Sequence, residues 1–181
     1  MGRGVRNGRI GNGTASRGGP GRSPVLDGTA DVRSLMTREL VLASPDERAA
    51  ALLERMDRGR FHHVLVVTPD ALESERAPFD RVPAEAIAGI VSAQDLLEQL
   101  RDLPLSEVCE LQAREVMSPA PLITVSASTS LKQALETLCD CSISALPVLE
   151  HGYLVGVVTT EDVLTAVALA RKQSATGSQN T

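Results

Sequence analysis

The chain has 181 residues, a net charge of −5 and a hydrophobic content of 43%, which is enough for one large domain or two small ones that share a core. The charge is uneven, because the first 30 residues contain five Arg and one Asp while the rest is acidic. An acidic body and only three aromatic side chains, two Phe and one Tyr, argue against nucleic acid as the main partner.

Cysteine spacing and hydropathy exclude further classes. The cysteines, at positions 109, 139 and 141, show no zinc-site spacing, and their odd number does not suggest a secreted disulfide framework. No apolar run approaches the roughly 18 residues of a membrane span, and the N-terminus lacks an apolar signal core. These patterns favour a cytoplasmic protein with no membrane contact and no metal.

Both ends of the chain have the composition of disordered tails. Residues 1–30 are rich in Gly and Arg and contain too few apolar side chains to offset the entropy of ordering. A basic tail can touch RNA or a membrane, but a solvated leader is the simpler interpretation. Residues 171–181 are predicted to be a second, frayed tail.

Between the tails the chain repeats itself. Residues 32–67 correspond to residues 113–149, so that Met36 matches Met117 and Leu53 matches Leu135. Two copies of one unit explain this better than chance similarity does.

Each copy predicts the same order of elements. In the first, a helix that begins near Ser44 precedes strands at 63–67 and 86–91 and a second helix over 93–101. In the second, a helix that contains Leu131 and Leu138 precedes strands at 145–149 and 153–158 and a final helix over 160–171.

Residues 68–86 separate the two strands of the first copy, where the second copy has only a short turn. This stretch contains three prolines and five acids and is predicted to be a surface insertion. It is either a tolerated long loop or a contact for a partner.

The last strand and last helix of each copy are joined by similar sequences, "GIVSAQDLL" at 89–97 and "GVVTTEDVL" at 156–164. Ser92 and Asp95 in the first correspond to Thr159 and Asp162 in the second. Such a pair can form an N-capping box. It can also hold a ligand, because a helix N-terminus attracts phosphate and a carboxylate accepts hydrogen bonds from ribose hydroxyls. Both interpretations stay open at this point.

A β-α-β-β-α unit with these two signatures resembles the cystathionine-β-synthase-type (CBS) domain. The stretches that carry the resemblance are "EVMSPAPLITVSAS", "SISALPVLEHGYLVGVVTTEDVL" and, more loosely, "SLMTRELVLASPD" and "GIVSAQDLL". Two such units look like a tandem CBS pair, or Bateman module. The resemblance implies an α+β fold of two repeats packed with pseudo-two-fold symmetry, with repeat one at 31–102 and repeat two at 103–170.

The resemblance also implies a function. CBS pairs are regulatory and commonly dimeric, so we expect a stand-alone, non-catalytic homodimer that binds AMP, ADP, ATP or S-adenosylmethionine and signals allosterically to an unidentified partner protein. No other cofactor is expected. The residues expected to contact ribose and phosphate are Ser92, Asp95, Thr159 and Asp162, and those expected to line the adenine pocket are Ile143 and Pro147.

The second copy departs from the family pattern in one place. Many CBS domains have a basic residue two positions before the proline of the second strand, where this chain has Ala145. The first copy has His63 in that register, so His63 is expected to contact the nucleotide, with Arg60 and His62 as other cations within reach. Alternatively, the two histidines are only a strand-edge pair.

Two rival functions follow from these residues. The missing charge at Ala145 favours a ligand-free structural or dimerisation module. An enzyme is disfavoured, because the sequence shows no Ser-His-Asp or Cys-His arrangement and no P-loop.

Overall fold

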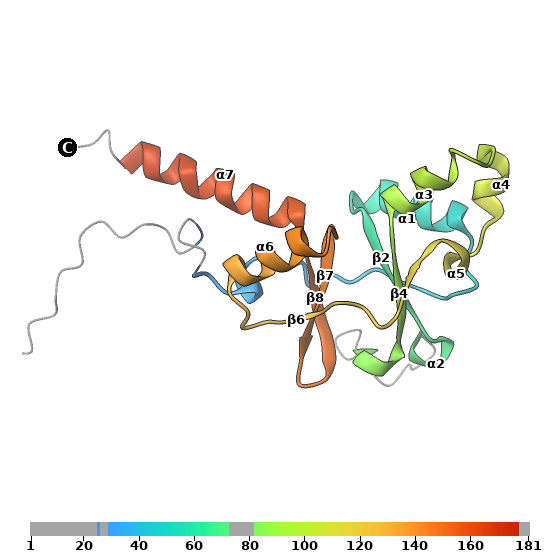
Figure 1. Cartoon of the computed structure of the whole chain (residues 1–181), viewed down its shortest axis with the longest axis horizontal. Coiled ribbons are helices and arrows are strands. Elements are labelled where there is room, and N and C mark those ends of the chain that lie inside the picture. Colours follow the sequence, from blue (N-terminus) through green and yellow to red (C-terminus); the bar gives the residue numbers. More distant parts are fainter. Residues whose placement is uncertain (1–24, 26–28, 73–81, 178–181) are drawn as a thin grey trace, which may run out of the picture.

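Two four-stranded sheets face each other at the centre of the protein, and helices cover their outer sides (Figure 1). The computed structural model describes residues 25, 29–72 and 82–177. The first sheet has the order β1 (Leu42–Ala43), β2 (His63–Val67), β4 (Ile87–Ser92), β5 (Ser118–Pro119). The second has the order β3 (Val82–Pro83), β8 (Tyr153–Thr159), β7 (Ala145–Glu150), β6 (Val125–Ser126). The predicted α+β fold with two similar halves is confirmed.

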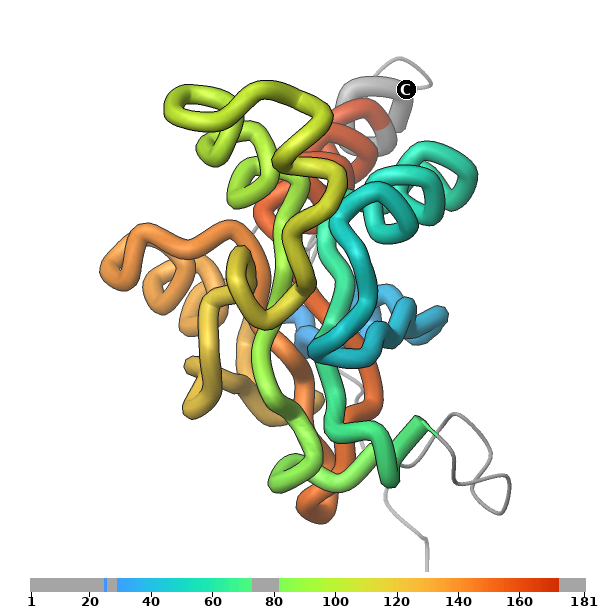
Figure 2. Tube along the Cα trace, turned by 90° about the vertical axis from the view of Figure 1, so that its right-hand side faces the viewer, coloured from blue at the N-terminus to red at the C-terminus, as the bar shows by residue number. Residues whose placement is uncertain are grey.

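Each half has its own set of helices (Figure 2). The first sheet is covered by α1 (Ala49–Gly59), α3 (Ala93–Gln99), α4 (Leu105–Glu110) and α5 (Ala113–Val116). The second is covered by α6 (Leu131–Asp140) and by the start of α7 (Thr160–Gly177). The shorter elements are η1 (Val32–Ser34), α2 (Pro69–Leu72) and η2 (Ala84–Ala86).

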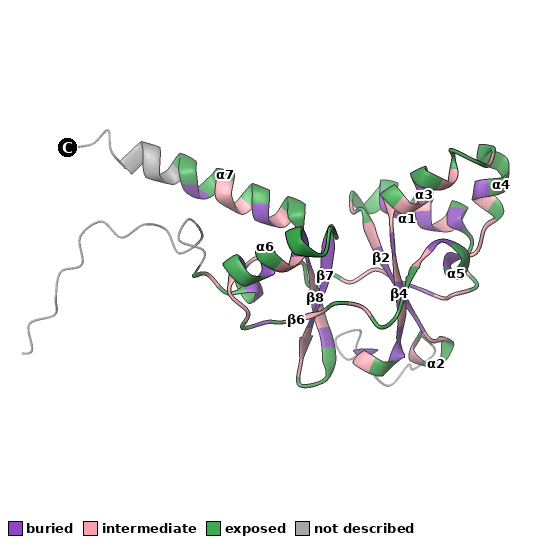
Figure 3. Ribbon diagram, in the orientation of Figure 1, coloured by how far each residue is buried: buried purple, intermediate pink, exposed green. Residues whose placement is uncertain are grey.

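Aliphatic side chains form three hydrophobic cores, one outside each sheet and one between the sheets. Strands that contact a core on each face have apolar residues at consecutive positions. One core lies between the first sheet and its helices, with Leu52 and Val64 fully buried, and a second holds Leu131 and Leu146 in the other half. The third contains residues of both sheets, such as Leu65 and Leu154, and packs the sheets together. Strand β2 is buried along most of its length because it has a core on each face (Figure 3).

Each half borrows a segment from the other. The backbone of Thr37, near the start of repeat one, exchanges hydrogen bonds of 2.9 and 3.0 Å with Val157 in β8 of repeat two. Conversely, β5, at the start of repeat two, pairs with β4 of repeat one. Gly156 and Gly89 make room for these crossings. A Cβ added to Gly156 would lie 2.9 Å from the carbonyl oxygen of Thr37.

The described ends of the predicted insertion at 68–86 are not all at the surface. Val82 and Ala86 are buried in the core between the sheets, and β3 pairs with β8 of the second repeat. The surface prediction is wrong there, because Val82 pairs with Leu154 of β8 and packs with Ala86 in this core. Residues 73–81 lie outside the described part.

The two predicted tails are only partly described. Helix α7 continues through residues 171–177, where the sequence predicted a frayed tail. Of residues 1–30, positions 25, 29 and 30 are described, and Val25 packs against the core of the second half. Within the described part of the chain, no helix is both long and apolar enough to cross a membrane.

Candidate functional site

Two clefts lie between the repeats, and each draws residues from both. The Thr159 cleft has a volume of about 590 Å³ and contains Thr159 and Asp162 from repeat two with Thr37, Phe61 and His62 from repeat one. The Ser92 cleft has a volume of about 580 Å³ and contains Ser92 and Asp95 from repeat one with Ser118, Ile143 and Pro147 from repeat two. The predicted site residues are therefore divided between two clefts, and His63 lines both.

The four hydroxyl and carboxyl side chains form N-capping boxes at the starts of α3 and α7. The Asp95 N–H donates to Ser92 Oγ at 3.1 Å, and Asp95 Oδ2 accepts from the Ser92 N–H and hydroxyl at 2.7 Å each. In α7 the corresponding distances are 3.2, 2.8 and 2.8 Å. The capping interpretation of these residues therefore describes their geometry in both repeats.

Capping leaves part of each carboxylate for a ligand. In both boxes the bonds go to Oδ2, and Oδ1 has no hydrogen bond within the described part of the chain. Each aspartate is only half-buried and lines its cleft. Cap and ligand contact are thus compatible, because one oxygen can hold the helix while the other accepts from a hydroxyl group.

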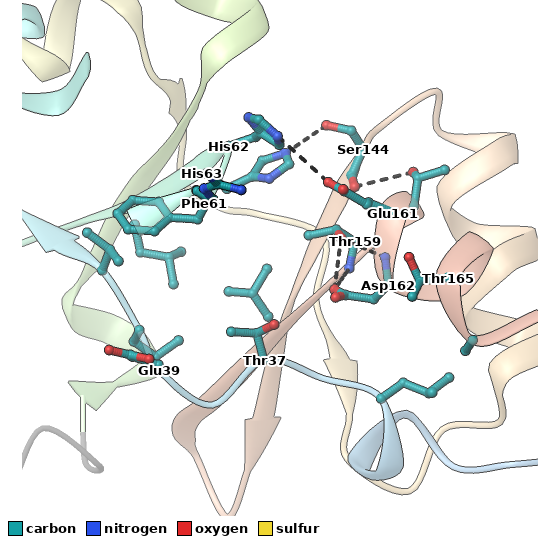
Figure 4. Close-up of a pocket in the computed structure, with 18 of the residues that line it drawn as sticks. Thr37, Glu39, Phe61, His62, His63, Ser144, Thr159, Glu161, Asp162 and Thr165 are labelled. Carbon is teal, nitrogen blue, oxygen red and sulfur yellow. Dashed lines mark hydrogen bonds and ion pairs between the residues drawn. The ribbon is translucent and has the colours of Figure 1, made fainter. Parts of the chain in front are cut away.

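His63 lies between the two clefts (Figure 4). Its ring nitrogen Nε2 is 2.9 Å from Ser144 Oγ of repeat two. Burial lowers the pKa of the His63 imidazole below 6.5, and the neighbouring His62 lowers it further. Three carboxylates act in the opposite direction without overcoming the shift: Asp95, Asp162 and Glu161. Near pH 7, His63 is therefore a neutral hydrogen-bonding group and not the cation that the sequence suggested.

Other charged side chains lie mainly in the Thr159 cleft. Arg60, Glu39 and Glu161 line it, and His62 Nε2 lies 3.7 Å from Glu161 Oε2. In Figure 4, His62 and His63 face Glu161 and Asp162 across this cleft. Of the residues lining the Ser92 cleft, Asp95 and Glu98 are acidic and none is Lys or Arg.

Sequence reasoning missed three lining residues, Thr37, Phe61 and Ser118. Phe61 occupies in the Thr159 cleft the repeat position that Ile143 occupies in the Ser92 cleft, and Thr37 and Ser118 form a second such pair. The repeat alignment could have identified these residues, because Phe61 aligns with Ile143 and Thr37 aligns with Ser118.

Neither cleft offers a metal centre within the described residues, because no group of three or more His, Cys, Asp or Glu there could hold an ion. Cys139 and Cys141 are exposed free thiols, and Cys109 is half-buried.

Comparison with known proteins identifies the repeats. A family model described as the CBS domain matches residues 32–73 and 113–169, which together are more than half of the chain. A search of the curated proteins finds no match.

Solved CBS structures share the fold. CBSX2, solved in complex with AMP, is 23% identical, with 78% of this chain and 98% of that chain covered and a TM-score of 0.55. A CBS domain pair solved with 5′-methylthioadenosine and S-adenosylmethionine is 16% identical, with 77% and 96% covered and a TM-score of 0.60. The CBS domain of a bacterial CNNM/CorC family Mg²⁺ transporter, solved with ATP, is 22% identical, with 80% and 92% covered and a TM-score of 0.60.

Proposed function

The chain belongs to the CBS domain family, and we propose that it is a regulatory protein that binds an adenosine-containing ligand in the clefts between its repeats. The solved relatives hold AMP, ATP, or 5′-methylthioadenosine and S-adenosylmethionine, which share an adenosine group. The structure that this chain has in common with them is the fold, so the proposal depends on the residues of its own clefts.

One observation carries the proposal: each cleft combines a capping box with an apolar wall from the other repeat. In the Ser92 cleft, Asp95 Oδ1 is available for ribose hydroxyls, and Ile143 and Pro147 supply apolar contact for a flat base. In the Thr159 cleft, Asp162 and Phe61 provide the same two features. A nucleoside has this composition, with polar hydroxyls at one end and an apolar ring at the other.

Regulation would follow from the position of the clefts. Because each cleft contains residues of both repeats, a bound ligand contacts both and favours one relative placement of them. A partner protein that prefers this placement would then bind with an affinity that depends on the ligand.

Isothermal titration calorimetry with AMP, ATP, S-adenosylmethionine and adenosine tests the proposal. We expect at least one compound to bind with a Kd below about 1 mM, and Asp162→Asn and Asp95→Asn to weaken binding at their own clefts. The absence of binding by all four would support the ligand-free structural module instead, which the uncharged Ala145 in the Ser92 cleft favours.

We also propose a homodimer. Large apolar side chains are exposed on two helices, with Leu97 of α3 exposed by 63% and Leu164 of α7 by 65%. Sedimentation velocity tests this. Leu164→Lys is expected to shift a dimer toward monomer, and a wild-type protein that sediments as a monomer at all concentrations would refute it.

A further inference from the structure

We propose that the two clefts select ligands of different charge, and that the left-handed residue that closes α1 or α6, Arg60 or Ser142, sets the difference. The Thr159 cleft takes a phosphorylated adenosine compound, and the Ser92 cleft takes one without phosphate, such as a nucleoside or its thioether. This inference rests on the proposed function, because it concerns the same two clefts.

Arg60 and Ser142 occupy the same structural position. Both have left-handed backbone conformations, each with a φ of 53°. The N–H of the next residue donates back to the preceding helix in both repeats, from Phe61 to the Met56 carbonyl at 3.3 Å and from Ile143 to the Leu138 carbonyl at 3.1 Å. The backbone therefore presents the two side chains to their clefts alike, and the difference between them is chemical.

In the Thr159 cleft this position supplies a guanidinium group. Arg60 is exposed, lines the cleft and forms no ion pair within the described part of the chain. Three acids also line this cleft, Glu39, Asp162 and Glu161. Glu161 lies within ion-pair distance of His62. The cleft also contains the N-terminus of the long helix α7, whose dipole favours an anion. A phosphate thus meets a cation and a favourable dipole here.

In the Ser92 cleft the same position supplies only a hydroxyl group. The charged residues that line this cleft are Asp95 and Glu98, and His63 is neutral near pH 7. The remaining wall combines uncharged polar side chains with apolar ones, among them Ile90, Leu122, Ile143 and Pro147. A phosphate here would face two carboxylates without a compensating cation, whereas an uncharged nucleoside would not.

A reciprocal exchange tests the inference. Adenosine and AMP are titrated into the wild type, Arg60→Ser, Ser142→Arg and the uncharged control Ser142→Gln. The ¹⁵N–¹H amide shifts of residues 93–96 report the Ser92 cleft, and those of residues 160–163 report the Thr159 cleft. In the wild type we expect adenosine to shift both sets and AMP to shift mainly the second.

The variants are expected to move only the AMP affinity. Arg60→Ser should weaken AMP at the Thr159 cleft by about fivefold, and Ser142→Arg should strengthen AMP at the Ser92 cleft by about fivefold, as expected for one exposed charge pair. Ser142→Gln adds a longer side chain without charge and should not strengthen AMP at the Ser92 cleft. Circular dichroism melting curves confirm that each variant folds.

The outcomes separate this inference from the proposed function. Two results would refute the charge selection and leave adenosine binding intact. One is that the wild-type Ser92 cleft binds AMP as tightly as adenosine, and the other is that Ser142→Arg gains no AMP affinity. Failure of both compounds to bind either cleft would overturn the proposed function, and the inference with it.

Discussion

His63 Nε2 lies 2.9 Å from the hydroxyl oxygen of Ser144, and this contact joins the two repeats where both clefts meet. The Ser144 carbonyl also accepts a 3.0 Å hydrogen bond from the N–H of Thr160, the first residue of α7. Ser144 therefore connects the start of β2 to the helix that carries Asp162. A ligand that displaces His63 in one cleft would move a group that the other cleft shares.

The lowered pKa of His63 predicts a pH dependence of stability. The unfolded chain binds a proton at His63 near pH 6.5, whereas the folded protein does so only at lower pH. The resulting stability is present above pH 6.5 and is lost as the pH falls toward the folded-state pKa. His63→Gln should remove this part of the pH dependence. Urea unfolding at several pH values between 5 and 8 measures it, and an unchanged slope in the variant would contradict it.

Removing the N-cap of α7 should lower the stability of the protein even when no ligand is bound. Thr159→Ala removes the hydroxyl that accepts from the Asp162 N–H at 3.2 Å, and we expect the free energy of unfolding to fall by about 1 kcal/mol without ligand. Thr159→Ser keeps the hydroxyl and is the matched control, and Ser92→Ala should give a similar loss in α3. Equal stability of Thr159→Ala and the wild type in urea unfolding would refute this role.

The two strand glycines predict matching effects of added methyl groups. Gly156→Ala would bring a Cβ within 2.8 Å of Met36 Sδ and 2.9 Å of the Thr37 carbonyl oxygen. Gly89→Ala would meet Met117 Sδ and the Ser118 carbonyl oxygen, both at 2.6 Å. Each variant should lose about 1–3 kcal/mol through overpacking.

Combining Gly156→Ala with Met36→Ala should not restore stability, because the backbone of Thr37 stays in the way. Full recovery in this double variant would show that only the flexible methionine opposes the methyl group. Thermal unfolding of the single and double variants provides the comparison.

Two apolar residues of the insertion should differ in how much they contribute to the free energy of unfolding. Val82 is 5% exposed in the core between the sheets, whereas Leu72 is 38% exposed. Val82→Ala should lower the free energy of unfolding by about 2 kcal/mol, and Leu72→Ala should change it by less than about 0.5 kcal/mol. Similar effects of the two changes would mean that β3 does not contribute to the core.

The sequence predicted the features that local patterns encode. The duplication, the paired strands and the caps at Ser92 and Thr159 all follow from side-chain periodicity and helix-start residues. The expected helix start near Ser44 was wrong, because α1 begins at Ala49 with Arg48 as its N-cap. The family resemblance supplied the pseudo-symmetric packing.

Long-range placement was less accessible from the sequence. Nothing in the local pattern of residues 82–86 indicates that they cover a strand of the other repeat. A single Val next to proline and acidic residues is typical of a loop. The lowered pKa of His63 depends on its burial between two clefts, which spacing alone does not reveal. The sequence likewise does not show that Ile143 and Pro147 share a cleft with Asp95 of the other repeat.

The crossing of residues 36–37 and 118–119 makes each half dependent on the other for a strand neighbour. A fragment that ended before residue 103 would leave β4 without β5, and Met36 without the core in which it is buried. Isolated repeats would then expose a bare sheet edge, which is a known route to aggregation. We therefore expect the pair to be the stable folding unit, so that a destabilising change in one copy also lowers the stability of the other.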